Sequence, residues 1–177
     1  MALGRMRIKS EHMAPRNRWK TVALPHSVAP TCGPPEELVY ARIGTLLDLK
    51  PVVRGEFDLI DCLERGLPAA AVAALRARAG LSDEEVFKLI APRRTLSRRQ
   101  ALGQPLAREE ADRVVRIARI AARAMQALGG KADIVADWLR RPKKALRGRT
   151  PMQALATEAG ALLVEDLLIG IEHGMFA

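Results

Sequence analysis

Apolar residues recur every three or four positions along most of the 177-residue chain from residue 34 onward, a spacing typical of amphipathic α-helices. The longest such stretch, 107–128, has an apolar face and an arginine-bearing face. The apolar face carries Val114, Ile117, Ala121, Met125 and Leu128, and Arg113, Arg116, Arg119 and Arg123 spread over the other. Alternating β-branched or aromatic runs are absent from the sequence, and only 3% of residues are aromatic. The pattern predicts an all-α protein with an aliphatic core.

Prolines, glycines and capping residues mark where the other predicted helices begin and end. Besides 107–128, we expect helices at 34–49, 58–65, 68–79, 82–90, 94–102, 132–141 and 158–172. Ser82–Glu85 and Thr150–Gln153 have the capping-box pattern, in which two side chains bind amides at the start of a helix. Pro142 ends one helix, and the basic segment 143–149 after it is expected to form a loop.

These breaks divide the chain into four predicted parts. Residues 1–33 are basic, contain three prolines and lack periodicity, so we expect a disordered tail. Residues 34–57 should form an N-terminal helix and a linker, 58–128 a helix-turn-helix domain, and 130–177 a smaller helical domain. Gly129-Gly130 would separate the last two parts, because glycines commonly end helices.

The net charge of +9 is distributed unevenly. Residues 88–149 contain 17 Lys and Arg against 5 Asp and Glu. Residues 150–177 contain no Lys or Arg and four acids, Glu158, Glu165, Asp166 and Glu172. Ordinary variation on a solvated surface is one explanation. Because the two blocks also differ in apolar pattern, we favour two partners of different kinds, one for the basic middle and one for the acidic, apolar end.

Residues 82–102 have the size of a helix-turn-helix, whose second helix enters the major groove of DNA. Four arginines occur within seven residues at the start of that second helix. The residues expected to bind DNA are Arg93, Arg94, Thr95, Ser97, Arg98 and Arg99. Arginine binds guanine and phosphate, and Thr and Ser suit phosphate contacts. Leu96 should face the core, as should Ala101 or Leu102.

Two points weigh against this interpretation. Two helices with a break between them occur in every all-α protein, and arginine clusters are often simply solvated. The turn also contains Pro92 and no glycine, so its geometry could differ from that of the common tight turn.

The last predicted helix, 158–172, is apolar over most of its circumference and is followed by His173 and then Gly-Met-Phe-Ala. Such a surface must be buried against something, and another protein is the natural candidate. Trp138 lies on one side of its helix with Ile134 and Val135. The pattern alone therefore indicates that Trp138 is a core residue rather than a stacking platform.

No arrangement typical of an enzyme is found in the sequence. His12, His26 and His173 lie in the predicted tail or near the C-terminus, no Ser or Cys has a suitable base partner, and no glycine-rich phosphate loop occurs. Cys32 and Cys62 are too few for a metal site, and a disulfide between them stays open. No stretch approaches the ~20 apolar residues of a membrane span. We expect a cytoplasmic protein that is not an enzyme, with no cofactor, metal or membrane partner.

Short motifs from about residue 66 onward point to a known family. They include Arg94-Thr95-Leu96 with Arg98-Arg99, then Ala136-Asp137-Trp138-Leu139, Leu146–Pro151 and Ile171–Ala177. In these motifs the sequence resembles the Xre/MbcA/ParS-type antitoxins of bacterial type II toxin–antitoxin systems, particularly the Xre antitoxins paired with RES-domain toxins. The C-terminal motifs are the more specific ones, and residues 1–55 show no such match.

The resemblance implies a DNA-binding domain that represses the protein's own operon, a C-terminal toxin-binding domain, and a homodimer suited to a palindromic operator. RES toxins degrade NAD⁺, and their antitoxins are thought to cover the active site with the C-terminal segment. Carried onto this sequence, the toxin-binding residues would be Trp138, Arg147, Arg149, His173, Gly174, Met175, Phe176 and Ala177. The acids of residues 150–177 would complement a cleft built to hold phosphates.

Three alternatives stay open. The protein could be a stand-alone helix-turn-helix regulator whose C-terminal helices only dimerise. The toxin could be an ADP-ribosyltransferase, as for ParS-like members of the family. Met175 and Phe176 could also fold back onto the protein's own helices instead of reaching a toxin.

Overall fold

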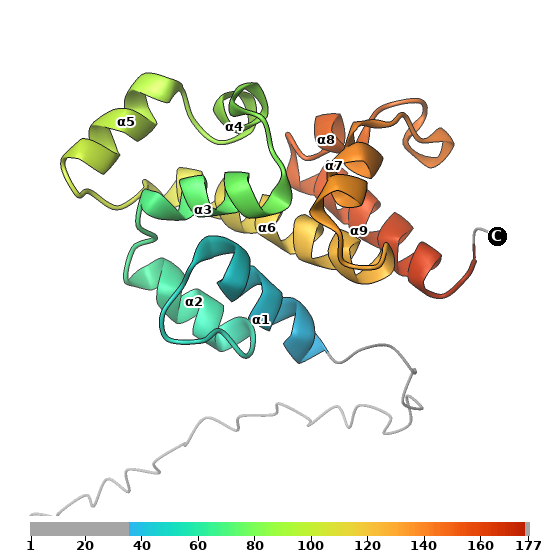
Figure 1. The fold of residues 1–177 in the computed structure, drawn as a ribbon, viewed down its shortest axis with the longest axis horizontal. Coiled ribbons are helices and arrows are strands. Elements are labelled where there is room, and N and C mark those ends of the chain that lie inside the picture. Colours follow the sequence, from blue (N-terminus) through green and yellow to red (C-terminus); the bar gives the residue numbers. More distant parts are fainter. Residues whose placement is uncertain (1–35, 176–177) are drawn as a thin grey trace, which may run out of the picture. The chain divides into compact units, whose positions relative to one another are not determined.

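The computed structural model describes residues 36–175, and every regular element in that range is helical, which confirms the all-α prediction (Figure 1). The elements are α1 (Glu36–Leu47), α2 (Glu56–Glu64), α3 (Ala70–Ala79), α4 (Asp83–Leu89), α5 (Arg93–Ala101), α6 (Arg108–Ala127), α7 (Ala132–Arg140), the 3-10 helix η1 (Lys144–Leu146), α8 (Pro151–Ala154) and α9 (Glu158–Glu172). The predicted tail at 1–33, and Phe176 and Ala177, lie outside the described residues. None of the described helices is long and apolar enough to cross a bilayer.

Local sequence explains where helices α4 and α8 begin. At α4 the Ser82 hydroxyl accepts a hydrogen bond from the Glu85 amide (3.2 Å), and the Glu85 carboxylate accepts one from the Ser82 amide (2.7 Å). Thr150 and Gln153 exchange the same two bonds at α8 (3.1 and 3.0 Å). Pro151 occupies the first position of α8, where no amide hydrogen is needed. Both capping-box predictions are confirmed.

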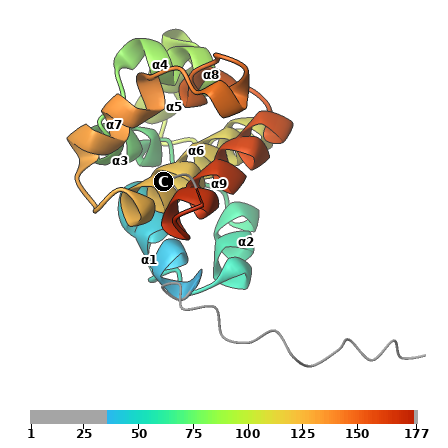
Figure 2. The ribbon, with the colours of Figure 1, turned by 90° about the vertical axis from the view of Figure 1, so that its right-hand side faces the viewer.

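Helix α6 is the centre of the fold, because α1 and α9 both pack along it (Figures 1 and 2). Of its predicted apolar face, Val114, Ile117 and Ala121 are at most 2% exposed, and Met125 and Leu128 near the end of the helix are half-buried. The same core extends from Ile43 in α1 to Leu168 in α9. The predicted helix-turn-helix region and the predicted C-terminal region therefore share one core, and the division of the chain between residues 128 and 130 stays a prediction.

Helix α5 differs from the others because it extends away from this core, at the upper left of Figure 1. Leu96 is buried as predicted, and it is the only buried residue of this helix. The expectation that Ala101 or Leu102 also faces the core is wrong, since both are exposed, Leu102 by 62%. Because α5 makes few contacts with other helices, its last turn has no apolar surface to pack against.

Candidate functional site

The outer side of α5 is the first candidate surface. Arg93, Arg94, Ser97 and Arg98 are exposed there, and Thr95 is half-buried. None of the ion pairs within residues 36–175 involves Arg93, Arg94 or Arg98. These three guanidinium groups are therefore available to an anionic partner.

The turn between α4 and α5 is shaped by Pro92. This residue has a φ of −57° and a ψ of 145°, and its carbonyl accepts hydrogen bonds from the amides of Thr95 (3.0 Å) and Leu96 (3.2 Å). Proline is held near this φ by its ring. No residue of the turn has a positive φ, so the turn needs no glycine.

Arg99, the remaining predicted DNA contact, is placed differently. Its Nε lies 2.8 Å from Oε2 of Glu110 in α6, and its terminal nitrogen donates a hydrogen bond to the Pro105 carbonyl (3.1 Å). The Nε–H of Arg99 makes no aligned hydrogen bond, so its contact with Glu110 is an ion pair. The two side chains are only 20% and 12% exposed. Arg99 is thus held by contacts within the protein.

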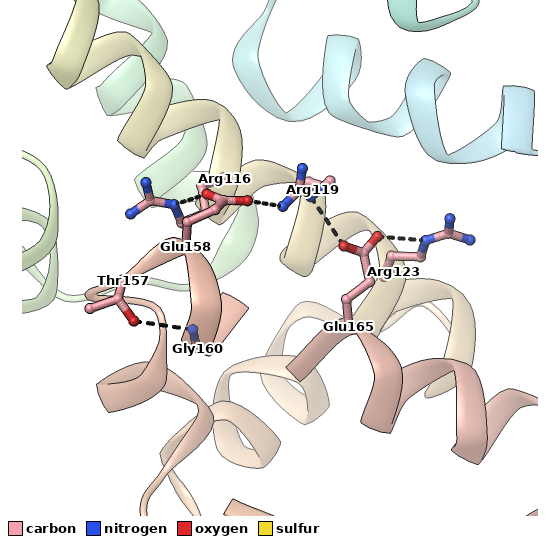
Figure 3. Close-up of polar contacts among 7 residues, drawn as sticks. All are labelled: Arg116, Arg119, Arg123, Thr157, Glu158, Gly160 and Glu165. Atoms are coloured by element: carbon pink, nitrogen blue, oxygen red, sulfur yellow. Dashed lines mark hydrogen bonds and ion pairs between the residues drawn. The ribbon is translucent and has the colours of Figure 1, made fainter. Parts of the chain in front are cut away.

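Helices α6 and α9 are joined by a ladder of ion pairs (Figure 3). Glu158 accepts hydrogen bonds from Arg116 (2.6 Å) and Arg119 (2.8 Å). Glu165 pairs with Arg119 and Arg123, at 3.3 Å in each case. The pairs follow in the same order along both helices, so the two helices run parallel. Burial opposes the charge of Glu158, but the hydrogen bonds from Arg119 and Arg116 outweigh it and lower the pKa of this carboxyl.

The ladder changes the interpretation of the charge pattern. Glu158 and Glu165 are paired with arginines of α6, and Glu172 accepts a hydrogen bond from Gln126 (2.7 Å). The expectation that the four C-terminal acids complement a phosphate-holding cleft is therefore wrong for Glu158 and Glu165, because an acid paired with arginine offers little net charge to a partner. Glu172 keeps its charge, since Gln126 is neutral. Part of the contrast between the basic and acidic blocks therefore reflects contact between Arg116, Arg119 and Arg123 and the two paired acids inside the fold.

The start of α9 needs a glycine. The Thr157 hydroxyl accepts a hydrogen bond from the Gly160 amide (3.1 Å), which caps the helix (Figure 3). A Cβ atom on Gly160 would lie 2.8 Å from the carbonyl carbon of Ala154. Gly160, which belongs to the region of the sequence resemblance, is thus explained by the close approach of α9 to the end of α8.

Arg140 attaches α7 to the helix-turn-helix region, a contact that the sequence analysis did not predict. Its guanidinium donates hydrogen bonds to both carboxylate oxygens of Glu85 (2.8 Å each) and to the Gly80 carbonyl (2.9 Å). The hydrogen bonds from Arg140 lower the pKa of Glu85. Glu85 therefore caps α4 and links it to α7 at the same time.

The basic loop at 143–149 has a defined conformation. Arg147 and Gly148 have positive φ angles of 53° and 79°, and Leu146 is buried. The Lys143 amide donates to the Arg149 carbonyl, and the Gly148 amide donates to the Lys143 carbonyl, at 3.0 Å in each case. Much of the Gly-Arg-Thr-Pro motif therefore has a structural role. Arg147 and Arg149 remain exposed, on a loop whose η1 segment contacts α9.

Trp138 packs against the core as a partly buried residue, which agrees with its interpretation from the pattern. The Nζ atom of Lys143 lies 4.5 Å from the centroid of its ring. Burial, and secondly the charge of Arg141, lower the pKa of Lys143. One face of the ring is thus covered by a cation, and the toxin contact of Trp138 stays a prediction.

Helix α9 ends in a Schellman motif. Gly174 has a φ of 68°, its amide donates to the Ile171 carbonyl (3.1 Å), and the Met175 amide donates to the Gly170 carbonyl (2.9 Å). His173, Gly174 and Met175 are all exposed, Met175 by 68%. Met175 therefore does not fold back onto the helices, whereas the same question for Phe176 lies outside the described residues.

Two adjacent leucines on α9 form a candidate contact that the sequence analysis did not single out. Leu162 and Leu163 are 51% and 59% exposed, while Ala161 and Val164 on the inner side are fully buried. Exposed apolar neighbours on an otherwise packed helix are typical of a protein interface. Their signal in the sequence was the continuous apolar run of this helix, which has more apolar residues than one buried face can use.

A metal site and a disulfide are the two further kinds of site that cysteine and acidic residues could form. Within residues 36–175, no three His, Cys, Asp or Glu side chains gather closely enough to hold a metal ion. Cys62 is buried, and Cys32 lies outside the described residues, so the question of a disulfide between them is unchanged.

Known proteins match the regions that contain these surfaces. An antitoxin Xre-like helix-turn-helix domain matches residues 58–119, and the antitoxin Xre/MbcA/ParS C-terminal toxin-binding domain matches residues 123–174. The chain is 37% identical over 134 residues to antitoxin Xre of Pseudomonas putida, which covers 76% of this chain and 82% of that protein. It is 31% identical over 128 residues to antitoxin Xre of Yersinia enterocolitica, covering 72% and 86% of the two chains. A Prs ADP-ribosylating antitoxin of Sphingobium sp. is 27% identical over 129 residues, covering 68% and 81%.

The two matched regions contain the two candidate surfaces of the structure. Helices α4 and α5 lie within the first matched region, and the basic loop and α9 lie within the second. The chain therefore belongs to the Xre/MbcA/ParS family of antitoxins from type II toxin–antitoxin systems, with a helix-turn-helix domain followed by a C-terminal toxin-binding domain.

Proposed function

We propose that this protein inhibits a cognate RES-domain toxin, an NAD-degrading enzyme, by covering the toxin's active site with its C-terminal segment. We further propose that it binds operator DNA as a homodimeric autorepressor and has no catalytic activity of its own. The observation that carries the first part is the end of α9. Its Schellman motif leaves Met175 68% exposed, so that this side chain is available to enter a cleft.

The proposed toxin-facing surface combines apolar and basic side chains. Leu162 and Leu163 supply apolar area on α9, and Arg147 and Arg149 lie on the loop that contacts this helix. The surface would continue through Trp138 on one side and His173, Gly174, Met175, Phe176 and Ala177 at the C-terminus. Apolar residues at the centre of an interface exclude water, and charged residues around them select the partner.

The proposed DNA-facing surface is the outer side of α5. The residues that would face the major groove are Arg93, Arg94, Thr95, Ser97 and Arg98. Their position on the second helix of the motif supports this placement. A second support is that the three arginines make no ion pair within residues 36–175. A palindromic operator suits a homodimer. Repression of its own operon would place the protein in the cytoplasm, with the DNA.

Two other functions have support of their own. The relative named as a Prs ADP-ribosylating antitoxin favours an ADP-ribosyltransferase as the toxin, although its identity of 27% is below the 37% of the Pseudomonas antitoxin Xre. A stand-alone regulator would instead use Leu162 and Leu163 for dimerisation, and these leucines are exposed in the single chain.

Co-expression with the toxin encoded beside this protein's gene distinguishes the three functions. Growth and cellular NAD⁺ are followed, and we expect both to be restored and the two proteins to co-purify. Restored growth without any earlier fall in NAD⁺ would indicate another toxin class. Neither rescue nor co-purification would favour the stand-alone regulator.

A charged substitution on α9 tests the proposed surface directly. The double variant Leu162→Asp, Leu163→Asp should fold but lose most of its rescue of growth, because two carboxylates would be buried at the interface. Val52→Asp is the matched control, since Val52 is 65% exposed and lies outside both matched regions. Full rescue by the double variant would exclude the outer side of α9 from toxin binding.

A further inference from the structure

Helix α5 carries the proposed DNA contacts but has little apolar attachment to the rest of the protein. Leu96 is its only buried residue, and the helix projects from the core (Figure 1). A helix that binds base edges must keep a fixed orientation, because these contacts depend on accurate placement. Something besides apolar packing therefore has to orient α5.

The contacts of Arg99 supply this attachment. Its guanidinium reaches Glu110 (2.8 Å) and the Pro105 carbonyl (3.1 Å), and both of these groups are themselves held in place. The amide of Leu106, next to Pro105, donates to the Leu67 carbonyl (2.8 Å). The Glu110 carboxylate also accepts a hydrogen bond from the amide that precedes α6 (2.8 Å). Arg99 thus connects α5 to two fixed points.

Burial strengthens the ion pair between Arg99 and Glu110. Glu110 is 9% exposed and is the one buried charged residue in the described part of the chain, and the Arg99 side chain is 20% exposed. An ion pair shielded from water is weakly screened by salt, and loss of one partner leaves an uncompensated charge. One turn further along α6, Arg113 donates to the Ile90 carbonyl at the end of α4 (2.9 Å). Helix α6 therefore holds both helices of the motif through polar side chains.

We propose that Arg99 is a positioning residue, whose ion pair with Glu110 orients α5 for operator recognition without itself touching DNA. This proposal rests on the proposed DNA-binding function and separates Arg99 from the other five predicted DNA contacts. It has a measurable consequence. A phosphate contact contributes to the salt dependence of binding, whereas a residue that only orients the helix does not.

The test compares variants of the full-length protein by fluorescence anisotropy. One labelled duplex carries DNA from directly upstream of the gene and is selected from overlapping segments that together cover this region. The other is a scrambled duplex of the same base composition. The protein is titrated against each duplex at several salt concentrations. The variants are Arg99→Met, Glu110→Gln and the double variant. Glu110→Gln removes the charge but keeps an oxygen for the amide before α6. Arg98→Met, the exposed neighbour on the same helix, is the matched control.

We expect Arg99→Met and Glu110→Gln each to weaken binding to the upstream duplex on the order of tenfold, the loss that follows when base contacts are misaligned. Neither variant should change the slope of log K against log salt, and the double variant should bind no more weakly than either single variant. Arg98→Met should weaken binding to both duplexes and reduce the slope by about 1. A reduced slope for Arg99→Met, with Glu110→Gln harmless, would make Arg99 a phosphate contact and overturn the proposal.

Hydrogen exchange separates this proposal from the operator-binding function on which it rests. If the wild-type protein binds the two duplexes equally well, the proposed operator-binding function is wrong. Hydrogen exchange then still tests whether the Arg99–Glu110 pair holds α5. The amides of α5 should exchange faster in Arg99→Met and Glu110→Gln than in the wild type, while those of α6 stay protected. Unchanged exchange in α5 would show that the pair does not hold the helix and would overturn the proposal whatever the DNA result.

Discussion

The two helices that present the proposed partner surfaces are attached to the protein in opposite ways. Helix α9 buries Ala161, Val164 and Leu168 and is also tied to α6 by the ion-pair ladder (Figure 3), whereas α5 buries only Leu96. Arginine–glutamate pairs occur in both places. In α9 they add to apolar packing, and in α5 one pair takes the place of such packing. The helix proposed to bind the toxin is therefore part of the global fold, while the helix proposed to bind DNA is a local unit.

The same truncation should have different consequences in the two helices. Leu168 is 1% exposed in the shared core, so Leu168→Ala should lower the free energy of unfolding by about 2–5 kcal/mol. Leu96→Ala should instead speed hydrogen exchange in α5 and change the global unfolding transition much less. Denaturant unfolding and hydrogen exchange measure the two effects. Equal loss of global stability in both variants would break the comparison.

The sequence could predict features that a few neighbouring residues determine. The eight helices predicted by range are all present, with ends within two residues of the prediction, and both capping boxes form as expected. Such features depend on contacts between residues close in the chain. The two acids of the ladder, Glu158 and Glu165, and Glu172 after them recur every seven residues, a spacing that places them on one face of a helix. That spacing indicates a partner helix but not which one, because Arg116 lies 42 residues away from Glu158.

In the candidate site, too, the local sequence does not show which side chains meet in the fold. Arg98 and Arg99 are adjacent and chemically identical, yet one is exposed and the other is paired with Glu110. Local pattern cannot separate them, since the difference depends on where α6 lies. Leu102 was expected in the core for the same reason: hydrophobicity predicts a preference for burial, and tertiary contacts decide whether a surface is there to bury it.

Acid should weaken the links of α7 and α9 to the rest of the fold. The hydrogen bonds from Arg140 to Glu85 lower the pKa of that carboxyl, and those from Arg119 and Arg116 to Glu158 outweigh its burial, so both pKa values lie below the ordinary 4.5. Such carboxylates stabilise the fold above their unfolded pKa, and this contribution is lost as the pH falls through the folded pKa. The free energy of unfolding should therefore decrease below pH 4.5.

Thermal unfolding between about pH 3 and pH 7 measures this effect, and Glu158→Gln isolates the ladder. The variant should be less stable than the wild type at neutral pH and should have a flatter pH profile. The expected change is smaller than that of Leu168→Ala, because the Glu158 side chain is 52% exposed and solvent screens its pairs. Parallel profiles for the two proteins would show that the ion pairs of Glu158 do not contribute to the pH dependence of stability in this range.

The smallest effect on stability, with a large effect on function, is expected at the end of α9. Gly174 has a φ of 68°, and no atom lies within 4 Å of a Cβ built there, so Gly174→Ala meets no clash and should cost only about 1 kcal/mol of local strain. Loss of the Schellman turn would redirect Met175 and the residues after it, and rescue of growth in co-expression should fall. Gly103→Ala is the matched control, since Gly103 also has a positive φ (61°) and open space but follows α5. If the two variants neutralise the toxin equally well, the direction of the last residues is irrelevant and occlusion by the C-terminal segment loses its support.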